Sequence, residues 1–184
     1  MAENVLDGTF SGRGIMFSGP GGGICNRVQI FANTINMRGS GSNSAGGIEA
    51  RGNNLLIGGN RIIRDNFPAS QAIGIATGGG SPIMVSTNEV NNFAVGITTY
   101  SVTIGVLNSN ILSNVNVGVQ SSGVNGASVT VKDSTLSGYP AGGPPLTGSV
   151  GILRVGESGT GVVYSINNTI SGFELQTSGG VITQ

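Results

Sequence analysis

Residues 33–35 read Asn-Thr-Ile and are followed by Gly47-Ile48, and near the other end Asn168-Thr169-Ile170 is followed by Gly180-Val181. Five further stretches contain the same motif: a small polar segment that ends in an aliphatic or aromatic residue, followed later by a Gly-aliphatic pair. The seven closing residues, here called anchors, are Phe10, Ile35, Ile62, Val90, Ile111, Leu136 and Ile170. The pairs are Gly14-Ile15, Gly47-Ile48, Gly74-Ile75, Gly96-Ile97, Gly118-Val119, Gly151-Ile152 and Gly180-Val181. Successive anchors are 25, 27, 28, 21, 25 and 34 residues apart, a period that indicates a solenoid or an array.

The composition indicates an ordered β protein with many tight turns. Glycine accounts for 34 of the 184 residues, and only 9% of residues are charged, against roughly 25% in an average globular domain. Disordered chains are poor in β-branched residues and carry a high net charge, whereas this chain is rich in Val and Ile and its charges cancel. Zero net charge predicts no electrostatic attraction to nucleic acid or to an anionic membrane. No apolar run approaches the ~20 residues of a membrane-spanning helix, so we expect no membrane insertion.

Three residue types and the N-terminus limit the chemistry and the cellular context. Cys25 is the only cysteine, and a lone thiol is more often a small buried hydrophobe than a nucleophile. Histidine and tryptophan are absent, which excludes an active site based on imidazole. The first five residues, Met-Ala-Glu-Asn-Val, lack the charged-then-apolar layout of a secretory signal. Either the protein is not exported by that route or its signal has been removed.

Short strands account for the length of the chain, and we interpret residues 1–184 as a single domain. No window of eleven residues shows the apolar spacing of a helix free of Gly or β-branched clusters. Apolar runs bounded by Gly, Asn and Ser occur instead at 28–30, 55–57, 83–85, 102–104, 129–131 and 163–166. Placed on the repeat, they predict three short strands per coil: one before the anchor, one beginning at it, and one carrying the Gly-aliphatic pair.

The repeat also predicts which residues face the core. We expect the seven anchors to point inward and to stack ~4.8 Å apart as an aliphatic ladder. The Asn and Ser residues before each anchor suit a turn, and their amides, stacked in register, would hydrogen bond along the axis. We assign the Gly before each third strand to a sharp bend with positive φ. Loops of variable length at 38–46, 65–71 and 139–148 are expected to project from one face.

The motifs Asn33-Thr34-Ile35 with Gly47-Ile48 and Asn168-Thr169-Ile170 with Gly180-Val181 also give the chain a family resemblance. Over nearly its whole length it resembles the right-handed parallel β-helices of the pectate-lyase-like superfamily, whose repeats read Asn, Thr or Ser, then Ile, and after a few turn residues Gly-Ile. The resemblance implies an all-β, right-handed parallel β-helix, here of about seven coils with three short strands each. It does not imply one activity, because this fold carries lyases, hydrolases, epimerases, tailspikes and inert adhesins.

The charged residues show no catalytic pattern of that fold. Its lyases need clustered carboxylates for a metal, and its hydrolases need two or three carboxylates on neighbouring coils. The eight acidic residues are spread at about one per coil, and the motifs Asn-x-Asp, Asp-Asp, His-Gly and Arg-x-Lys are missing. We therefore predict no catalytic residue, no metal site and no cofactor, and we favour a role other than catalysis.

Arg61, Arg64 and Asp65 form the densest charge cluster and are the candidate ligand-binding residues. A solvated face is the simpler interpretation of the same three residues. Counting three residues past an anchor places Arg13, Arg38 and Asp65 on consecutive coils, which predicts a surface ladder of ion pairs worth ~0–1 kcal/mol each.

The ends of the chain suggest self-association. Native solenoids cover their terminal coils to protect unpaired strand edges, and neither end of this sequence shows such a cap. From Val181 to Phe10 of a following copy the count is 13 residues, close to the 14 to 20 of the same segment inside the chain. We therefore expect head-to-tail stacking through Val5, Leu6, Phe10, Val181, Ile182 and Gln184. The alternative is that the chain is a piece of a longer β-helix.

Three functions are compatible with the sequence. The favoured one is a structural subunit of an extracellular, cell-surface or viral fibre, with a further copy of itself as partner. The second is a carbohydrate-active enzyme or a fragment of one, such as a polysaccharide lyase or a tailspike depolymerase. The third is an adhesin module that binds polysaccharide without cleaving it. Long threads in electron micrographs would favour the first function, and new unsaturated ends on acidic polysaccharides the second.

Overall fold

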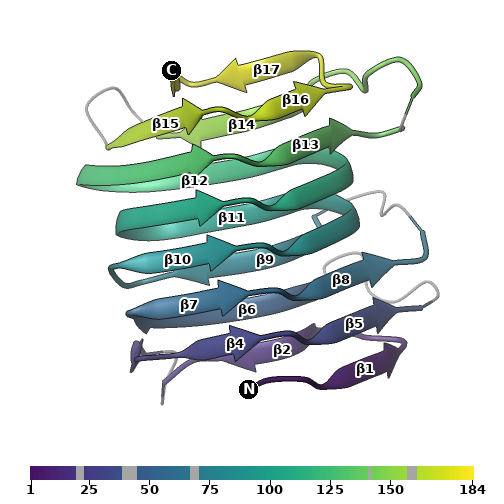
Figure 1. The fold of residues 1–184 in the computed structure, drawn as a ribbon, viewed down its shortest axis with the longest axis vertical. Coiled ribbons are helices and arrows are strands. Elements are labelled where there is room, and N and C mark those ends of the chain that lie inside the picture. Colours follow the sequence, from purple (N-terminus) through teal and green to yellow (C-terminus); the bar gives the residue numbers. More distant parts are fainter. Residues whose placement is uncertain (20–22, 39–44, 67–70, 141, 157–160) are drawn as a thin grey trace.

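A computed structural model describes residues 1–19, 23–38, 45–66, 71–140, 142–156 and 161–184, without the side chains of 123–125. The described residues form strands and the turns between them (Figure 1). The strands are β1 (Val5–Gly8), β2 (Arg13–Phe17), β3 (Cys25–Asn26), β4 (Gln29–Phe31), β5 (Thr34–Met37), β6 (Gly46–Asn53), β7 (Leu55–Gly58), β8 (Arg61–Arg64), β9 (Ile73–Gly78), β10 (Ile83–Ser86), β11 (Glu89–Asn108), β12 (Ile111–Lys132), β13 (Thr135–Gly138), β14 (Val150–Val155), β15 (Val162–Ile166), β16 (Thr169–Ser171), β17 (Leu175–Ser178) and β18 (Ile182–Thr183). Most of the loops expected at 38–46 and 65–71 lies outside the described residues.

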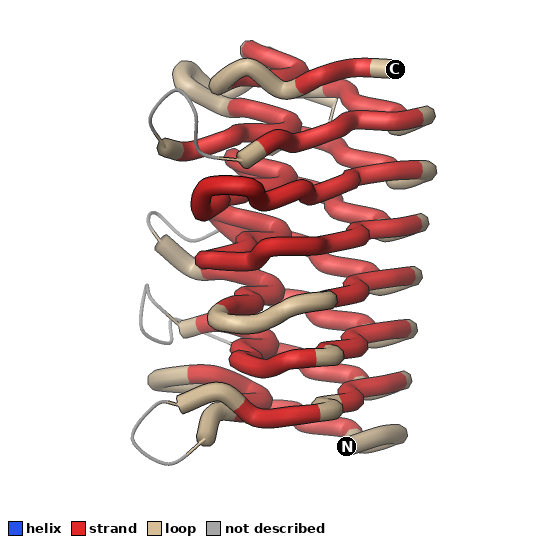
Figure 2. Tube along the Cα trace, turned by 90° about the vertical axis from the view of Figure 1, so that its left-hand side faces the viewer, coloured by secondary structure: helices blue, strands red, loops and turns tan. Residues whose placement is uncertain are grey.

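The strands wind round one axis as a parallel β-solenoid. Every strand pairing among the described residues is parallel, and each joins segments that lie one winding apart. Figure 1 shows the windings stacked from β1 at one end to β17 at the other, and Figure 2 shows the same stack from the side, with the two termini at opposite ends. The all-β class and the parallel solenoid predicted from the repeat are confirmed.

Seven apolar side chains stack along the interior and form what we call the anchor column. Strand pairing places them in register in the order Leu6, Ile35, Ile62, Val90, Leu112, Leu136 and Ile170. The five inner members are fully buried, whereas Leu6 and Ile170, at the two ends, are partly exposed. The predicted ladder is confirmed at five of its positions, but Phe10 and Ile111 do not belong to it.

The prediction for Ile111 is wrong by one residue. Ile111 pairs with Glu89 and is 53% exposed, while its neighbour Leu112 takes the inward position. Successive side chains of a strand point to opposite faces, so a shift of one residue exchanges core and solvent. The residue that marks the register is Asn110, which stands two before the inward position, as an asparagine does in most windings.

The prediction for Phe10 is wrong for a related reason. In the first winding the inward residue is Leu6, which pairs with Ile35. Phe10 lies beyond the end of β1 and is partly buried against the core. Asn4 stands two residues before Leu6, so the first copy of the repeated phrase ends at Leu6.

The glycines of the Gly-aliphatic pairs let adjacent windings approach closely. A Cβ on Gly74 would lie 2.2 Å from Cγ1 of Val90 and 2.7 Å from the carbonyl oxygen of Gly96, both one winding on. The same conflict, with the next anchor side chain and the next backbone carbonyl, recurs at Gly14, Gly47, Gly96, Gly118 and Gly151. None of these six glycines has a positive φ, so the sharp bend expected from the sequence is wrong at these positions; Gly180, in the seventh predicted pair, has a φ of 75°. Close packing, not backbone conformation, requires glycine here.

Two further inward columns contribute to the core. The first reads Ile15, Ile48, Ile75, Ile97, Val119, Ile152 and Thr177. The second reads Ile30, Ile57, Val85, Leu107, Val131, Ser165 and Thr183. Gly180-Val181, the seventh predicted pair, is therefore misassigned, because Gln176-Thr177 holds that position in the last winding.

Candidate functional site

A recurring turn positions the polar side chain that stands two residues before each member of the anchor column. The residue ahead of that side chain has a left-handed backbone, with φ between 50° and 62°, at Glu3, Ala32, Gly59, Thr87, Ser109, Asp133 and Asn167. The turn connects two strands of one winding and is repeated in every winding. The polar side chains that follow it form the asparagine column, which consists of Asn4, Asn33, Asn60, Asn88, Asn110, Ser134 and Asn168.

Hydrogen bonds link the asparagine column along the axis. Asn60 donates from its backbone N–H and from Nδ2 to Oδ1 of Asn88, at 3.0 and 2.9 Å, and Asn33 donates in the same way to Asn60. Nδ2 of Asn60 also donates to the carbonyl oxygens of Gly58, at 3.1 Å, and of Ile30 in the preceding winding, at 3.0 Å. The buried amides thus find partners in the turns, and each ties neighbouring windings together. The axial hydrogen bonds predicted from the sequence are confirmed.

The asparagine column has a direction. In every step a backbone N–H donates to a side-chain oxygen in the next winding toward the C-terminal end, and the hydroxyl of Ser134 takes this place for Asn110, at 3.1 Å. At the N-terminal end, Oδ1 of Asn4 accepts no hydrogen bond from another described residue. At the C-terminal end, the N–H of Asn168 donates none within the same set of residues. One end of the stack therefore presents an acceptor and the other a donor.

The residues predicted as an assembly interface lie on the two end windings. Val5 and Ile182 are its most exposed apolar members, at 73% and 43%. Gln184 is exposed as well. The members partly buried against the core are Leu6, Phe10 and Val181. Among the described strands β1 pairs only with β5, and β16 only with β13, so each has an outer edge without a strand partner.

The two termini occupy equivalent positions at opposite ends of the stack. Ala2 forms a parallel bridge with Phe31, which places residues 1–2 one winding before Ile30 and Phe31. Thr183 pairs with Ser165, a member of the column that leads back to Ile30. Residues 1–2 and 183–184 therefore stand at the same place in the winding.

Arg61, Arg64 and Asp65, the candidate ligand-binding residues, do not gather at one place. Arg61 lies on the outer surface, where Nε donates to Oε2 of Glu89 at 3.1 Å. Arg64 points inward and is only 4% exposed; Nη1 donates to the carbonyl oxygen of Ala45, and burial lowers the pKa of the guanidinium. Asp65 is exposed beyond the end of β8. Three residues along a strand separate opposite faces, which is why the two arginines diverge.

The surface ladder predicted for Arg13, Arg38 and Asp65 does not form as expected: among the described residues Arg38 and Arg13 pair with other carboxylates, and Asp65 acts on Arg38 only through its charge. Arg38 binds Asp7 of the preceding winding through Nε and Nη2. Hydrogen bonding from Arg38 lowers the pKa of the Asp7 carboxyl, and Asp7 in turn raises the pKa of Arg38, to which the charge of Asp65 adds. Arg13, expected in this ladder, pairs instead with Glu49. The reason is that Arg13 belongs to β2 and lies on another wall of the solenoid.

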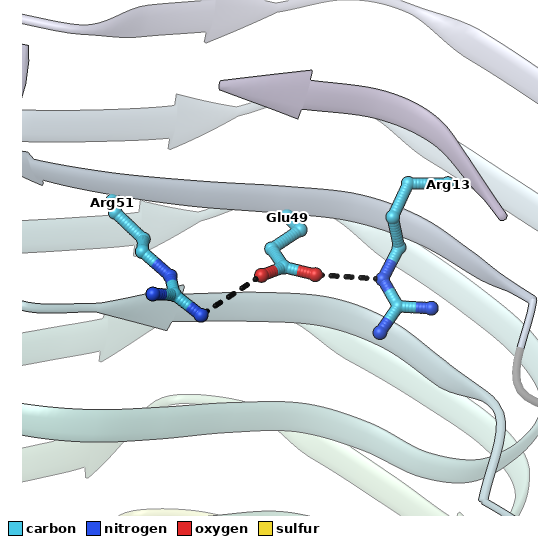
Figure 3. Close-up of polar contacts among 3 residues, drawn as sticks. All are labelled: Arg13, Glu49 and Arg51. Atoms are coloured by element: carbon cyan, nitrogen blue, oxygen red, sulfur yellow. Dashed lines mark hydrogen bonds and ion pairs between the residues drawn. The ribbon is translucent and has the colours of Figure 1, made fainter. Parts of the chain in front are cut away.

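Arg13, Glu49 and Arg51 form a cluster that sequence reasoning missed (Figure 3). Nε of Arg13 donates to Oε2 of Glu49 at 2.9 Å, and Nη2 of Arg51 lies 3.4 Å from Oε1. Arg13 reaches Glu49 past Gly46, its partner in register, where a Cβ would lie 3.0 Å from Cδ of Arg13. Arg13 and Glu49 are 36 residues apart, so no local spacing signals the contact.

The described part of the chain has no feature of a metal site or of a membrane-spanning helix. Within it, no group of three or more His, Cys, Asp or Glu side chains lies close enough to hold a metal ion. The same residues contain no helix with the length and hydrophobicity that crossing a membrane requires. Cys25 carries a free thiol and is partly buried against the core.

No protein-family model, no curated protein and no solved structure matches this chain. The family expected from the repeats therefore stays a prediction, and the function has to be inferred from the geometry of the described residues.

Proposed function

We propose that this protein is a structural subunit without catalytic activity, which stacks head to tail into an extracellular, cell-surface or viral fibre. Its partner is a second copy of the same chain. In this proposal the solenoid is a right-handed parallel β-helix of about seven coils with three short strands each. The observation that carries the proposal is the direction of the asparagine column, which leaves an acceptor on Asn4 and a donor on Asn168.

Head-to-tail stacking would satisfy both ends of the asparagine column at once. The N–H of Asn168 in one copy donates to Oδ1 of Asn4 in the next, which repeats the bond made between windings inside the chain. A head-to-head contact would bring two acceptors together, and a tail-to-tail contact two donors. A heterologous contact of this kind generates an open filament when its rotation does not close.

The apolar core supports the same junction. Leu6 and Ile170 end the anchor column, and each has an apolar neighbour on its inner side only. Stacking places Leu6 of one copy on Ile170 of the other at a spacing of ~4.8 Å. It also pairs the outer edge of β1 with the outer edge of β16, and unpaired strand edges are templates for association.

The termini set a condition on the junction. In the stack, residues 1–2 of one copy and residues 183–184 of the other would occupy the same position, so one of the two pairs has to be displaced. The count of 13 residues that suggested a seamless junction used Phe10 and Val181, neither of which lies in the column assumed for it. We expect residues 1–2 to be displaced from this position, because they precede the first strand, whereas Thr183 belongs to β18.

Assembly of the purified 184-residue chain tests the proposal. Electron microscopy and sedimentation should show threads that lengthen with protein concentration. Asn4→Ala should raise the critical concentration about tenfold or more, because the buried N–H of Asn168 is left without an acceptor at each junction. Asn26→Ala is the matched control, because it removes one hydrogen bond between windings at a place away from the junction. The bond is donated by Nδ2 of Asn53 to Oδ1 of Asn26 at 3.1 Å. This variant should assemble normally.

A chain that begins at Glu3 tests the displacement step separately. It should assemble at a lower concentration than the chain 1–184, because no residues have to be moved. Folded monomers at millimolar concentration for both chains would overturn the proposal. Closed trimers, or the release of unsaturated sugars from acidic polysaccharide, would favour the enzymatic alternative.

A further inference from the structure

A cleft of about 250 Å³ opens on the side of the solenoid. Its lining includes Glu49 and Arg51 of β6, Gly78 at the end of β9, Tyr100 of β11, and Ile24 from the segment before β3. None of the residues of the proposed junction lines it. The cleft is therefore distinct from the surface through which we propose that the copies stack.

The cleft exists because Gly78 has no side chain. Strand register places Gly78 between Arg51, one winding before it, and Tyr100, one winding after it. The side chains of Arg51 and Tyr100 thus start about 9.6 Å apart, twice the strand spacing, with bare backbone between them. A Cβ on Gly78 would lie 3.4 Å from Cβ and 4.0 Å from Cδ2 of Tyr100, so the phenol ring borders this gap.

Arg51 is the cationic group among the described residues that line the cleft. Among the described residues its side chain makes one polar contact, with Oε1 of Glu49 at 3.4 Å, and it is 52% exposed. Glu49 is held more closely by Arg13, at 2.9 Å, and Arg13 does not line the cleft. The charge of the carboxylate is thus balanced by Arg13, which leaves the guanidinium of Arg51 as the excess charge at the cleft.

We infer that the cleft binds a small monocarboxylate that carries a flat apolar ring, for which benzoate is the simplest probe. The carboxylate binds the guanidinium of Arg51, whose planar donors match its two oxygens. The ring lies over the backbone of Gly78 and packs against Tyr100 in an offset arrangement. Ile24, which is 51% exposed, adds apolar surface next to Gly79.

The size and the charge of the cleft narrow the class of ligand. Its volume of about 250 Å³ accommodates one ring with a short substituent. The single excess positive charge, that of the Arg51 guanidinium, matches one carboxylate group. The aromatic border favours a flat ring over a puckered one.

Isothermal titration calorimetry of the 184-residue chain with sodium benzoate tests the inference. Saturable binding at one site per chain is expected, and benzamide, which has the same ring without the charge, should bind at least tenfold more weakly. Arg51→Gln should weaken benzoate binding tenfold or more, because the charge-assisted pair is lost. Arg61→Gln is the matched control, since Arg61 is equally exposed and also paired with a glutamate, and it should leave binding unchanged.

Two further variants separate a binding role from a structural one. Gly78→Leu fills the gap and should abolish binding; Gly78→Ala, whose Cβ would meet its nearest atoms at 3.3 Å or more, is the milder variant should leucine disturb the fold. Glu49→Gln should strengthen binding severalfold, because Arg51 is released and the repulsion of the anion is removed. A purely structural cluster predicts no such gain.

No saturable benzoate binding to the unmodified chain at millimolar concentration would overturn the inference, as would binding that Arg51→Gln leaves intact. Assembly is measured on the same samples, and Arg51→Gln and Gly78→Leu should form threads like the unmodified chain. Loss of benzoate binding and loss of assembly are therefore distinguishable failures.

Discussion

Thr87 shows at the residue scale how a turn can hold an unfavourable backbone in place. Its φ is 55°, in the left-handed region that Asn and Gly tolerate and that a β-branched side chain disfavours. The turn keeps this conformation because the N–H of Thr87 donates to the carbonyl oxygen of Asn108 in the next winding, at 3.0 Å. The conformation is thus imposed by stacking, against the local preference of the residue.

Replacement of Thr87 by asparagine should stabilise the protein. Thr87→Asn is expected to raise the free energy of unfolding by about 1 kcal/mol, because the strain of the left-handed backbone is relieved. Urea denaturation measures the change. Thr103→Asn is the control, since Thr103 is also exposed and has no positive φ, and it should not stabilise. A destabilised Thr87→Asn variant would contradict the assignment of this turn.

The pair of Asp7 and Arg38 predicts a pH dependence at the residue scale. Hydrogen bonding from Arg38 lowers the pKa of Asp7 below its ordinary value of 3.8. A carboxyl whose pKa is lower in the folded state stabilises it above the unfolded pKa, and this contribution is lost as the pH falls through the folded pKa. In an NMR titration Arg38→Ala should return the pKa of Asp7 toward 3.8. Arg61→Ala, which removes the partner of Glu89, is the control that should leave Asp7 unchanged.

At the scale of the strand, the alternation of side chains between the two faces decides which of two adjacent aliphatic residues is part of the core. Leu112 is fully buried in the anchor column, whereas Ile111 is 53% exposed. Leu112→Ala should lower the free energy of unfolding by about 2–5 kcal/mol, and Ile111→Ala should change it by no more than about 0.5 kcal/mol. Urea denaturation of the two variants compares these values directly. The reverse order would show that β12 is out of register.

The glycines of the Gly-aliphatic pairs predict a second effect at the scale of the strand. Gly74→Ala should destabilise by about 1–3 kcal/mol, because its Cβ meets both Val90 and the backbone oxygen of Gly96, and a backbone atom cannot move aside. Gly12→Ala is the control, since a Cβ there meets nothing within 4 Å and its φ is not positive. Thermal unfolding distinguishes the two variants. Equal melting temperatures would refute close packing as the reason for glycine.

At the scale of the whole molecule, the register of the two termini predicts how copies can be joined. Gln184 stands in the position of Phe31, and Glu3 stands in that of Ala32, with left-handed φ values of 56° and 51° at Glu3 and Ala32. A second copy that begins at Glu3 and directly follows Gln184 would therefore continue the winding in register.

This tandem protein should unfold as one cooperative unit at a higher temperature than the single chain. The gain arises because the junction buries one open end from each copy, and the stability of a solenoid is approximately a sum over its repeats and their interfaces. A fusion that retains residues 1–2 of the second copy has two extra residues at the junction. Its melting temperature should therefore rise by less. Calorimetry measures both, and two independent transitions in the first fusion would contradict the shared register.

Much of the architecture follows from local features of the sequence. A small polar segment that ends in an aliphatic residue, followed by a spaced Gly-aliphatic pair, was enough to predict an all-β parallel solenoid and five of the seven inward anchors. The axial hydrogen bonds of the asparagines were predictable for the same reason, since stacking in register places equivalent side chains above one another. The sequence indicated that both ends of the solenoid lack a cap. It did not show that the N-terminal end presents a hydrogen-bond acceptor and the C-terminal end a donor, because this depends on the direction of the hydrogen bonds between windings.

Only the tertiary structure decided the features that depend on pairing between windings. Asn110-Ile111-Leu112 offers two adjacent aliphatic residues, and alternation alone does not say which one faces inward; the pairing of Leu112 with Val90 does. The opposite directions of Arg61 and Arg64, and the contact of Arg13 with Glu49 across 36 residues, arise in the same way. The sequence by itself determined the period and the class of the fold, because these are properties of neighbouring residues. The register, the glycine contacts and the cleft at Gly78 were decided by the stack, because each depends on the residue that lies one winding away.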